Sequence, residues 1–501
     1  MQINKYKKND ILELDIVDMT NEGLGISKID GQVFFVKDAL IGDKVEVLIT
    51  KITSNIIYAK TTSIIKESKD RVKVECSVAN ACGGCKILSL NYQKQLELKK
   101  EYTLTCMSKI GRFGMSPYQG VIGANKIYNF RNKMQIPFAM RDGVIVYGFY
   151  AGRTHHIIEF ENCVTGFNGS KLILDTIKGA LKKFNLSIYD EKTQSGVFRE
   201  VMLRKGNETG EVSITYILND NNYKKHFDLY KKFDEYIVST CNSAYLSDES
   251  RRRGEHCEPI VTIVTSTINI NTKNNNTIFG NENVTLRGKG YIEDTIGDMK
   301  YHISPESFYQ VNSEMTKKLY DKIVEYGDFK GDENVLDLYC GIGTISLYVA
   351  KKVKSIVGVE VVKKAIENAK ENAVLNSVDN AYFLEANLET DGDILDDVVT
   401  EKFKSGIDVV IVDPPRKGLD ELTINYIKKI RPKKLIYVSC NPATLARDLD
   451  ILCHAEMRND EIVHNDSKYE PSYRLVNMVN VDMFPHTMHV ECVVLMSKTN
   501  T

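Results

Sequence analysis

The sequence predicts an α/β protein built from three parts, and each part has its own pattern of residues. Short runs rich in Val and Ile, separated by turn residues, occupy residues 10–65. The stretch from 120 to about 300 is mostly strand-like, and strand–helix alternation begins near residue 330. We therefore expect a small β-barrel over 1–65, a mainly β central domain over 66–300, and a Rossmann-like, doubly wound domain over 301–501.

The N-terminal part contains about five short apolar runs, separated by turn sequences such as Asp30-Gly31 and Gly42-Asp43. So many short strands in so few residues favour a closed barrel of the OB type, although the pattern also fits other small β-domains. The expected strands cover 12–19, 25–29, 33–36, 45–52 and 56–62.

The central part begins with a cluster of cysteines and a polar, helix-prone stretch over 92–118. This stretch is a candidate for packing on the C-terminal domain despite its place in the chain. The segments that follow alternate like strands, and Asn274-Asn275-Asn276 marks an exposed loop tip.

The overall composition says more about where the protein is located than about which partners it binds. No uninterrupted apolar run is long enough to cross a bilayer, and the N-terminus lacks the apolar core of a secretory signal. We therefore expect a cytoplasmic protein with no membrane partner, and a monomer, since no protein partner can be identified. The net charge of −1 does not indicate a nucleic-acid binder, so any RNA contact would rest on local basic faces.

A cofactor site is predicted where the first strand of the alternating region ends. The turn Asp337–Thr344 reads Asp-Leu-Tyr-Cys-Gly-Ile-Gly-Thr, and Glu360 ends the second strand, where it can accept both ribose hydroxyls of an adenosine. A dinucleotide site would require a third glycine for the pyrophosphate, and none is present. The turn resembles motif I of class I S-adenosylmethionine methyltransferases, with Tyr339 in place of the usual first glycine.

Two further strand-end loops carry reactive groups. Asp413-Pro414-Pro415-Arg416 follows the fourth strand and Cys440 follows the fifth, at the edge where open α/β sheets bind ligands. Cys440 is therefore a candidate nucleophile, and the alternative is a buried packing cysteine. Amino-methyltransferases acting on adenine place an aromatic residue where Arg416 stands, which argues against that activity.

Five stretches of the second half carry a family resemblance: Ile303–Asn312, Asp337–Gly343, Asp413–Gly418, Ser439–Pro442 and Pro485–Glu491. Together they resemble the RumA/TrmA family of RNA (uracil-5-)-methyltransferases. The N-terminal part resembles a TRAM domain, an OB-like RNA-binding barrel found in the 23S ribosomal RNA branch. The resemblance implies methylation of uracil C5 in 23S ribosomal RNA. Two alternatives stay open: a transfer-RNA uracil-5 methyltransferase, and a non-catalytic RNA-binding protein of the same fold.

The resemblance also implies roles for single residues. Cys440 is the nucleophile that adds to C6 of uracil and makes C5 reactive, and Glu491 is the base that removes the C5 proton. Spacing alone favours a different interpretation of Glu491, a solvated glutamate at a strand end. Asp413 helps to hold or polarise the uracil, and Thr344 stands where ribosomal members often have Asn. The residues placed around S-adenosylmethionine and the uracil are Gln310, Tyr339, Thr344, Glu360, Asn387 and Asp413.

Four cysteines suit a metal centre: Cys76, Cys82, Cys85 and the distant Cys163. Four thiolates bind zinc or an iron–sulfur cube, but structural zinc usually uses two paired knuckles, and Cys163 has no nearby second cysteine. We therefore expect a [4Fe–4S] cluster, as the family pattern also implies, that ties the central domain together and shapes the RNA-binding surface. The other cysteines are expected to be packing residues: Cys106, Cys241, Cys257, Cys340, Cys453 and Cys492.

Overall fold

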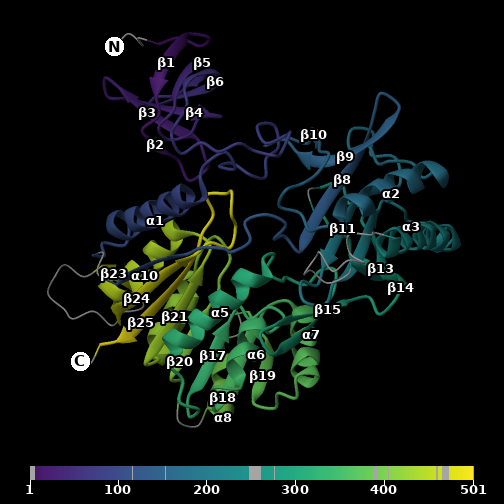
Figure 1. Ribbon diagram of the computed structural model, residues 1–501. Coiled ribbons are helices and arrows are strands. Elements are labelled where there is room, and N and C mark those ends of the chain that lie inside the picture. Colours follow the sequence, from purple (N-terminus) through teal and green to yellow (C-terminus); the bar gives the residue numbers. More distant parts are fainter. Residues whose placement is uncertain are drawn as a thin grey trace.

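The structure is a computed structural model with three bodies, which Figure 1 shows as an N-terminal barrel, a central domain and a C-terminal α/β domain. It describes residues 6–114, 117–152, 154–247, 261–275, 277–387, 392–403, 406–458, 461–464 and 473–499. Cys257 lies outside these residues. Within them, no helix is long and apolar enough to cross a membrane.

The N-terminal body is a six-stranded, barrel-like sheet in the order β1-β5-β6-β4-β3-β2. Along β5 the side chains of Val45, Val47 and Ile49 are buried, and they alternate with more exposed residues. This alternation of period two encloses a small core of its own, which explains why the apolar runs predicted these strands. The strands are β1 (Ile11–Asp15), β2 (Asp18–Met19), β3 (Gly25–Ile29), β4 (Gln32–Lys37), β5 (Lys44–Ile52) and β6 (Ile56–Lys66).

The central domain is a seven-stranded mixed sheet in the order β10-β9-β8-β11-β12-β13-β14. Two helices, α2 (Ser170–Lys183) and α3 (Phe227–Ser247), pack against the sheet, and sequence analysis singled out neither. The buried residues Ile173, Ile177 and Leu181 of α2 do recur at helical spacing, so the signal was present. The strands are β8 (Lys133–Arg141), β9 (Val144–Tyr150), β10 (Ile157–Glu159), β11 (Phe198–Lys205), β12 (Glu211–Leu218), β13 (Thr262–Ile270) and β14 (Glu282–Arg287).

The C-terminal domain is an eight-stranded sheet in the order β19-β18-β17-β20-β21-β25-β24-β7. Its first five strands are parallel, as the strand–helix alternation predicts. β25 then pairs antiparallel with β21, and β24 pairs antiparallel with β25. The strands are β17 (Asn334–Leu338), β18 (Ser355–Glu360), β19 (Ala381–Glu385), β20 (Val409–Val412), β21 (Lys434–Ser439), β24 (Tyr473–Val481) and β25 (Glu491–Lys498). The helices are α5 (Ser313–Gly327), α6 (Thr344–Ala350), α7 (Lys363–Leu375), α8 (Gly392–Lys402), α9 (Glu421–Ile430) and α10 (Pro442–His454).

Two segments from earlier in the chain also belong to this body. Strand β7 (Tyr118–Ile122) extends its sheet by pairing with β24, and α1 (Tyr92–Lys109) packs on α10. The hairpin of β15 (Ile292–Ile296) and β16 (Met299–Ile303), most of which precedes the expected boundary at 301, contributes buried residues to the C-terminal core.

Helix α1 presents a polar face to the loop between β24 and β25. Gln95, Lys99 and Thr103 recur every fourth residue and are all buried. The Lys99 ammonium contacts the Asp482 carboxylate, both fully buried, and donates to the Phe484 carbonyl over 3.0 Å. The Gln95 side chain accepts from the His486 amide, and Thr103 accepts from Asn480. These contacts hold the loop that leads into Glu491.

We expect Lys99→Met to lower the free energy of unfolding by about 3 kcal/mol or more, because it leaves Asp482 buried without its cation. Urea unfolding followed by fluorescence measures this loss. Lys100→Met is the matched control, since Lys100 is exposed on the same helix. Adding Asp482→Asn to Lys99→Met should recover part of the loss. Equal stability of the Lys99 and Lys100 variants would contradict the importance of this ion pair.

Candidate active site

A cavity of about 710 Å³ lies at the carboxyl ends of the parallel strands of the C-terminal sheet. This volume is in the range of small-molecule ligand pockets. Every residue for which sequence analysis predicted a catalytic or cofactor role lines this one cavity: Gln310, Tyr339, Thr344, Glu360, Asn387, Asp413, Cys440 and Glu491.

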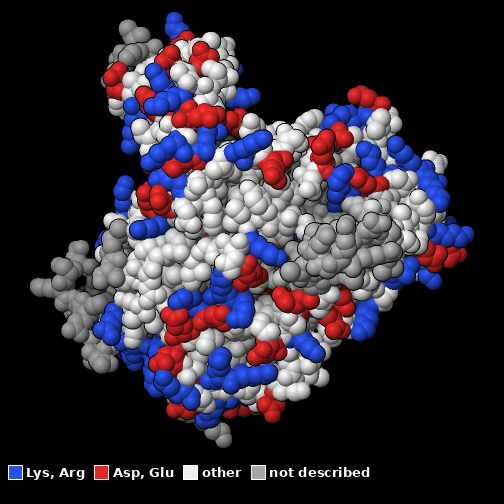
Figure 2. Space-filling view, viewed as in Figure 1, with Lys and Arg blue, Asp and Glu red and all other residues white. Residues whose placement is uncertain are grey.

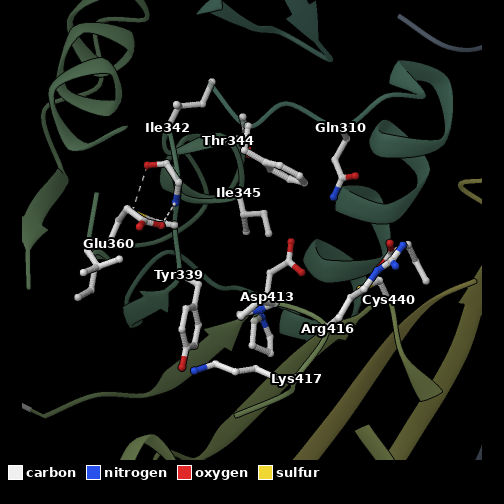
Figure 3. Close-up of a pocket in the computed structure, with 18 of the residues that line it drawn as sticks. Gln310, Tyr339, Ile342, Thr344, Ile345, Glu360, Asp413, Arg416, Lys417 and Cys440 are labelled. Atoms are coloured by element: carbon white, nitrogen blue, oxygen red, sulfur yellow. Dashed lines mark hydrogen bonds between the residues drawn. The ribbon is translucent and has the colours of Figure 1, made fainter. Parts of the chain in front are cut away.

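The turn after β17 forms one end of the cavity. Tyr339 has a φ of 67°, in the left-handed region, which explains why a glycine usually stands at this place. Its hydroxyl lies 3.1 Å from Thr423 Oγ1 and 3.3 Å from Asp420 Oδ2. The Glu360 carboxylate accepts the amide hydrogens of Gly341 and Val362, and Figure 3 shows it beside the turn. These two bonds fix a carboxylate where the sequence predicts ribose contacts.

Gly343 is required by close packing at the start of α6. Its φ is 79°, and a Cβ there would lie 2.9 Å from the Phe383 ring and 3.2 Å from the Ala369 Cβ. The next residue, Thr344, accepts a hydrogen bond of 2.7 Å from the Tyr320 hydroxyl. The turn is therefore held against its neighbours by packing and by hydrogen bonds.

The other end of the cavity is formed by the loops after β20 and β21. The Asn441 side-chain amide donates to the Arg416 carbonyl over 3.1 Å, and Thr444 donates to the same oxygen over 3.2 Å. These bonds join the loop of Asp413 to the loop of Cys440. In Figure 3 the side chains of Asp413 and Gln310 point into the same space, with Cys440 beside it.

Glu491 reaches the cavity through strand pairing. β25 runs antiparallel to β21, and Cys492 lies opposite Ser439. Glu491, which precedes Cys492, and Cys440, which follows Ser439, therefore lie at the same end of the strand pair. Glu491 and Cys440 therefore meet although 50 positions separate them in the printed sequence. Glu491 is only 3% exposed, which rules out the solvated glutamate that spacing alone allowed.

Burial and negative charge set the protonation of these groups. Burial, with the nearby carboxylates of Glu491 and Asp413, raises the pKa of the Cys440 thiol to about 11. Burial raises the pKa of both carboxyl groups, and Asp413 adds to the effect on Glu491 while Arg416 opposes it. Beneath them, burial raises the pKa of Asp337, which accepts from Ser346, to about 7. The cavity thus suits a positively charged ligand, which would offset these carboxylates.

Four aromatic residues in the cavity wall were not predicted to have a role: Phe308, Tyr320, Phe484 and His489. Phe308 is 69% exposed although it is large and apolar, and His489 lies near Glu491. Both fall within stretches that carry the family resemblance, but nothing in the sequence shows that their rings face a cavity. Burial and the nearby cations, Arg416 first among them, lower the pKa of His489, so its ring is neutral at pH 7.

The four predicted metal-binding cysteines also meet in space. Cys76, Cys82, Cys85 and Cys163 all line one small cavity between the central domain and the linker, residues 67–91, which joins β6 to α1. Among the described residues, no three side chains of His, Cys, Asp or Glu are close enough to share a single metal ion. The other described cysteines are buried, as packing residues are: Cys106, Cys241, Cys340, Cys453 and Cys492.

Comparison with known proteins places this site in a family. The model of the tRNA (uracil-5-)-methyltransferase family matches residues 233–499, more than half of the chain, and the TRAM model matches 5–61. The chain belongs to the tRNA (uracil-5-)-methyltransferase family. The predicted membership of the RumA/TrmA family is thereby confirmed, as is the N-terminal TRAM domain.

Relatives of this family match along the whole chain. An uncharacterized RNA methyltransferase of Bacillus cereus is 38% identical over 98% of this chain and 97% of its own length. One of Clostridium tetani is 37% identical over 98% and 97%. The structure of Pyrococcus abyssi tRNA (uracil-54, C5)-methyltransferase with S-adenosyl-L-homocysteine superposes with a TM-score of 0.70 and 25% identity, covering 97% of this chain and 100% of that one. The predicted fold class and the S-adenosylmethionine cofactor are confirmed by these matches.

The raised pKa of Cys440 predicts its reactivity in the cofactor-free protein. Alkylation by iodoacetamide, measured on the peptide that contains Cys440, should accelerate with pH up to about 11, because only the thiolate reacts. Glu491→Gln removes a negative charge beside the sulfur, so this variant should react faster at mildly alkaline pH. A rate that stops rising at the ordinary thiol pKa of about 8.5 would contradict this electrostatic account.

Proposed function

We propose that this RNA methyltransferase methylates C5 of a uridine in 23S ribosomal RNA through a covalent Cys440–C6 adduct. The observation that carries the proposal is the meeting of a cysteine and a buried glutamate beside a nucleoside-type turn in one cavity. This chemistry needs a nucleophile and a base on the same pyrimidine, and Cys440 and Glu491 are a pair of that kind.

Cys440 and Glu491 carry out different steps of the proposed reaction. The Cys440 thiolate adds to C6 of the uracil, and the electron pair displaced onto the ring makes C5 nucleophilic. After C5 has gained a methyl group, Glu491 removes the C5 proton, and elimination breaks the bond between C6 and the sulfur. The raised pKa of Glu491 makes its carboxylate a stronger base for this step. Asp413 and Gln310 are placed to hold the ring.

The cavity fits the methyl donor by its chemistry. S-adenosylmethionine supplies a methyl group on a cationic sulfonium. Glu360 would accept its ribose hydroxyls, and the turn with Tyr339 and Thr344, together with Asn387, would surround it. The carboxylates of the cavity favour that positive charge, and the charge in turn would lower the pKa of Cys440 toward a reactive thiolate.

The choice of ribosomal RNA rests on the TRAM domain and on the cysteine cavity, both of which resemble the 23S branch. Transfer RNA is the competing substrate, because the Pyrococcus abyssi structure that matches nearly the whole chain is a tRNA (uracil-54, C5)-methyltransferase.

We also propose that the four cysteines hold a [4Fe–4S] cluster. A zinc ion binds each of four sulfurs at about 2.3 Å, which would draw them close together. The four cysteines line a common cavity, and Cys163 has no nearby second cysteine with which to form the paired knuckle that structural zinc usually uses. The cluster would tie the linker, with Cys82 and Cys85, to the central domain at Cys163.

The covalent step and the substrate can be tested together. We expect the protein with S-adenosylmethionine to form a stable conjugate with 23S ribosomal RNA that carries 5-fluorouracil, because the base cannot remove fluorine from C5. Gel electrophoresis measures the conjugate, with transfer RNA assayed in parallel. Cys440→Ala should abolish it, whereas Cys453→Ala, a buried cysteine of α10, should not. Conjugation to transfer RNA alone would contradict 23S ribosomal RNA as the substrate. Conjugation of the Cys440→Ala variant would contradict Cys440 as the nucleophile.

The protein purified without oxygen should contain about four iron and four sulfide ions per chain, which chemical analysis measures. Cys82→Ser should lose most of both, because it removes one of four thiolates. Cys453→Ala serves as control here as well. Stoichiometric zinc in place of iron would refute the cluster.

A further inference from the structure

Two cations lie side by side in the central sheet. Lys133 of β8 and Arg204 of β11 are direct partners in antiparallel pairing, so their side chains share one face of the sheet. Figure 2 shows acidic and basic residues interspersed over much of the visible surface, in keeping with the net charge of −1. The pairing of Lys133 with Arg204, with no acidic side chain of a described residue between them, therefore differs from this mixture of opposite charges.

Neither cation has a carboxylate partner among the residues that the structure describes. Arg204 is 3% exposed; its terminal nitrogen donates to the carbonyls of Pro305 and Ser307, while its Nε has no partner among the described residues. Lys133 is half-buried, and burial together with Arg204 lowers its pKa to about 8, so it stays mostly protonated at pH 7. Within the described part of the chain, no carboxylate acts on the pKa of either; burial lowers the pKa of Arg204, and only the Tyr309 phenol opposes that effect. Such uncompensated charge is costly to bury and favours an anion.

The pair adjoins the wall of the active-site cavity. The carbonyls that Arg204 binds come directly before Phe308, which lines the cavity. Asn132, next to Lys133, donates to the Gln310 carbonyl over 2.8 Å. An anion at Lys133 would thus lie next to the segment that forms the cavity wall.

We propose that Lys133, with Arg204 behind it, binds a phosphodiester group of the RNA close to the target nucleotide. This inference rests on the proposed function, because the cavity must accept a base of an RNA chain. Lys133 makes the contact, since it reaches the surface. Arg204 contributes its charge and fixes the cavity wall at Pro305 and Ser307. A phosphate is the anion that an RNA chain carries at every nucleotide.

Salt-dependent RNA binding tests this contact. With a short single-stranded oligouridylate as the probe, Lys133→Met should weaken binding roughly tenfold and reduce the slope of log affinity against log salt concentration by about 0.7. Lys133→Arg should keep the wild-type slope, because it keeps the charge. Lys182→Met is the matched control, as Lys182 is exposed on helix α2. Binding of S-adenosylhomocysteine should be equal in all of these proteins, which shows that the cavity is intact.

Probes in which single phosphates are replaced by neutral methylphosphonates locate the contact. One replacement should weaken binding to the wild type but have no further effect on Lys133→Met. An unchanged salt slope in Lys133→Met, or equal sensitivity of both proteins to every replacement, would overturn the phosphate site. These results leave the proposed function standing, whereas failure of the wild type to bind or conjugate any RNA would overturn the function itself.

Discussion

The active site depends on one pairing of strands, that of β25 with β21. Because β25 runs antiparallel beside the last parallel strand, its first residue, Glu491, meets the loop that follows β21 and carries Cys440. The pairing must also hold its register, since a slip of one residue would turn Glu491 to the other face of the sheet. The loop before Glu491 is fixed separately by helix α1, through the buried contact of Lys99 with Asp482.

The electrostatics of the cavity follow from this arrangement. Four carboxyl groups, those of Glu360, Asp413, Asp420 and Glu491, line a partly buried space that also holds the Cys440 thiol. Burial first, and then repulsion from the carboxylates of Glu491 and Asp413, raises the pKa of the Cys440 thiol and keeps it protonated. A cationic donor would offset that repulsion, so the structure links nucleophile activation to cofactor binding. The same acidity makes the cavity a poor site for a phosphate group, which fits a cofactor without one.

The three bodies contribute to one site rather than acting as separate modules. The central domain supports the wall of the cavity through Arg204 and Asn132. The barrel and the linker meet the loop before Glu491 in a small apolar cluster that contains Met19, Ile87 and Met488. RNA that contacts the barrel or the central domain would therefore contact parts of the protein that support the cavity wall and the loop before Glu491.

Much of this protein is readable from the sequence alone. The runs of Val and Ile predicted most of the barrel and the parallel strands, because burial on one or both faces leaves a local pattern. The turn at Tyr339 and the strand-end positions of Asp413 and Cys440 also followed from local context. Tertiary structure alone decided the remainder. Burial of Glu491, the polar face of α1 against the β24–β25 loop, and the pairing of Lys133 with Arg204 all join residues far apart in the chain. Such contacts arise from the register and packing of distant elements, which leave no periodic signal in the residues themselves.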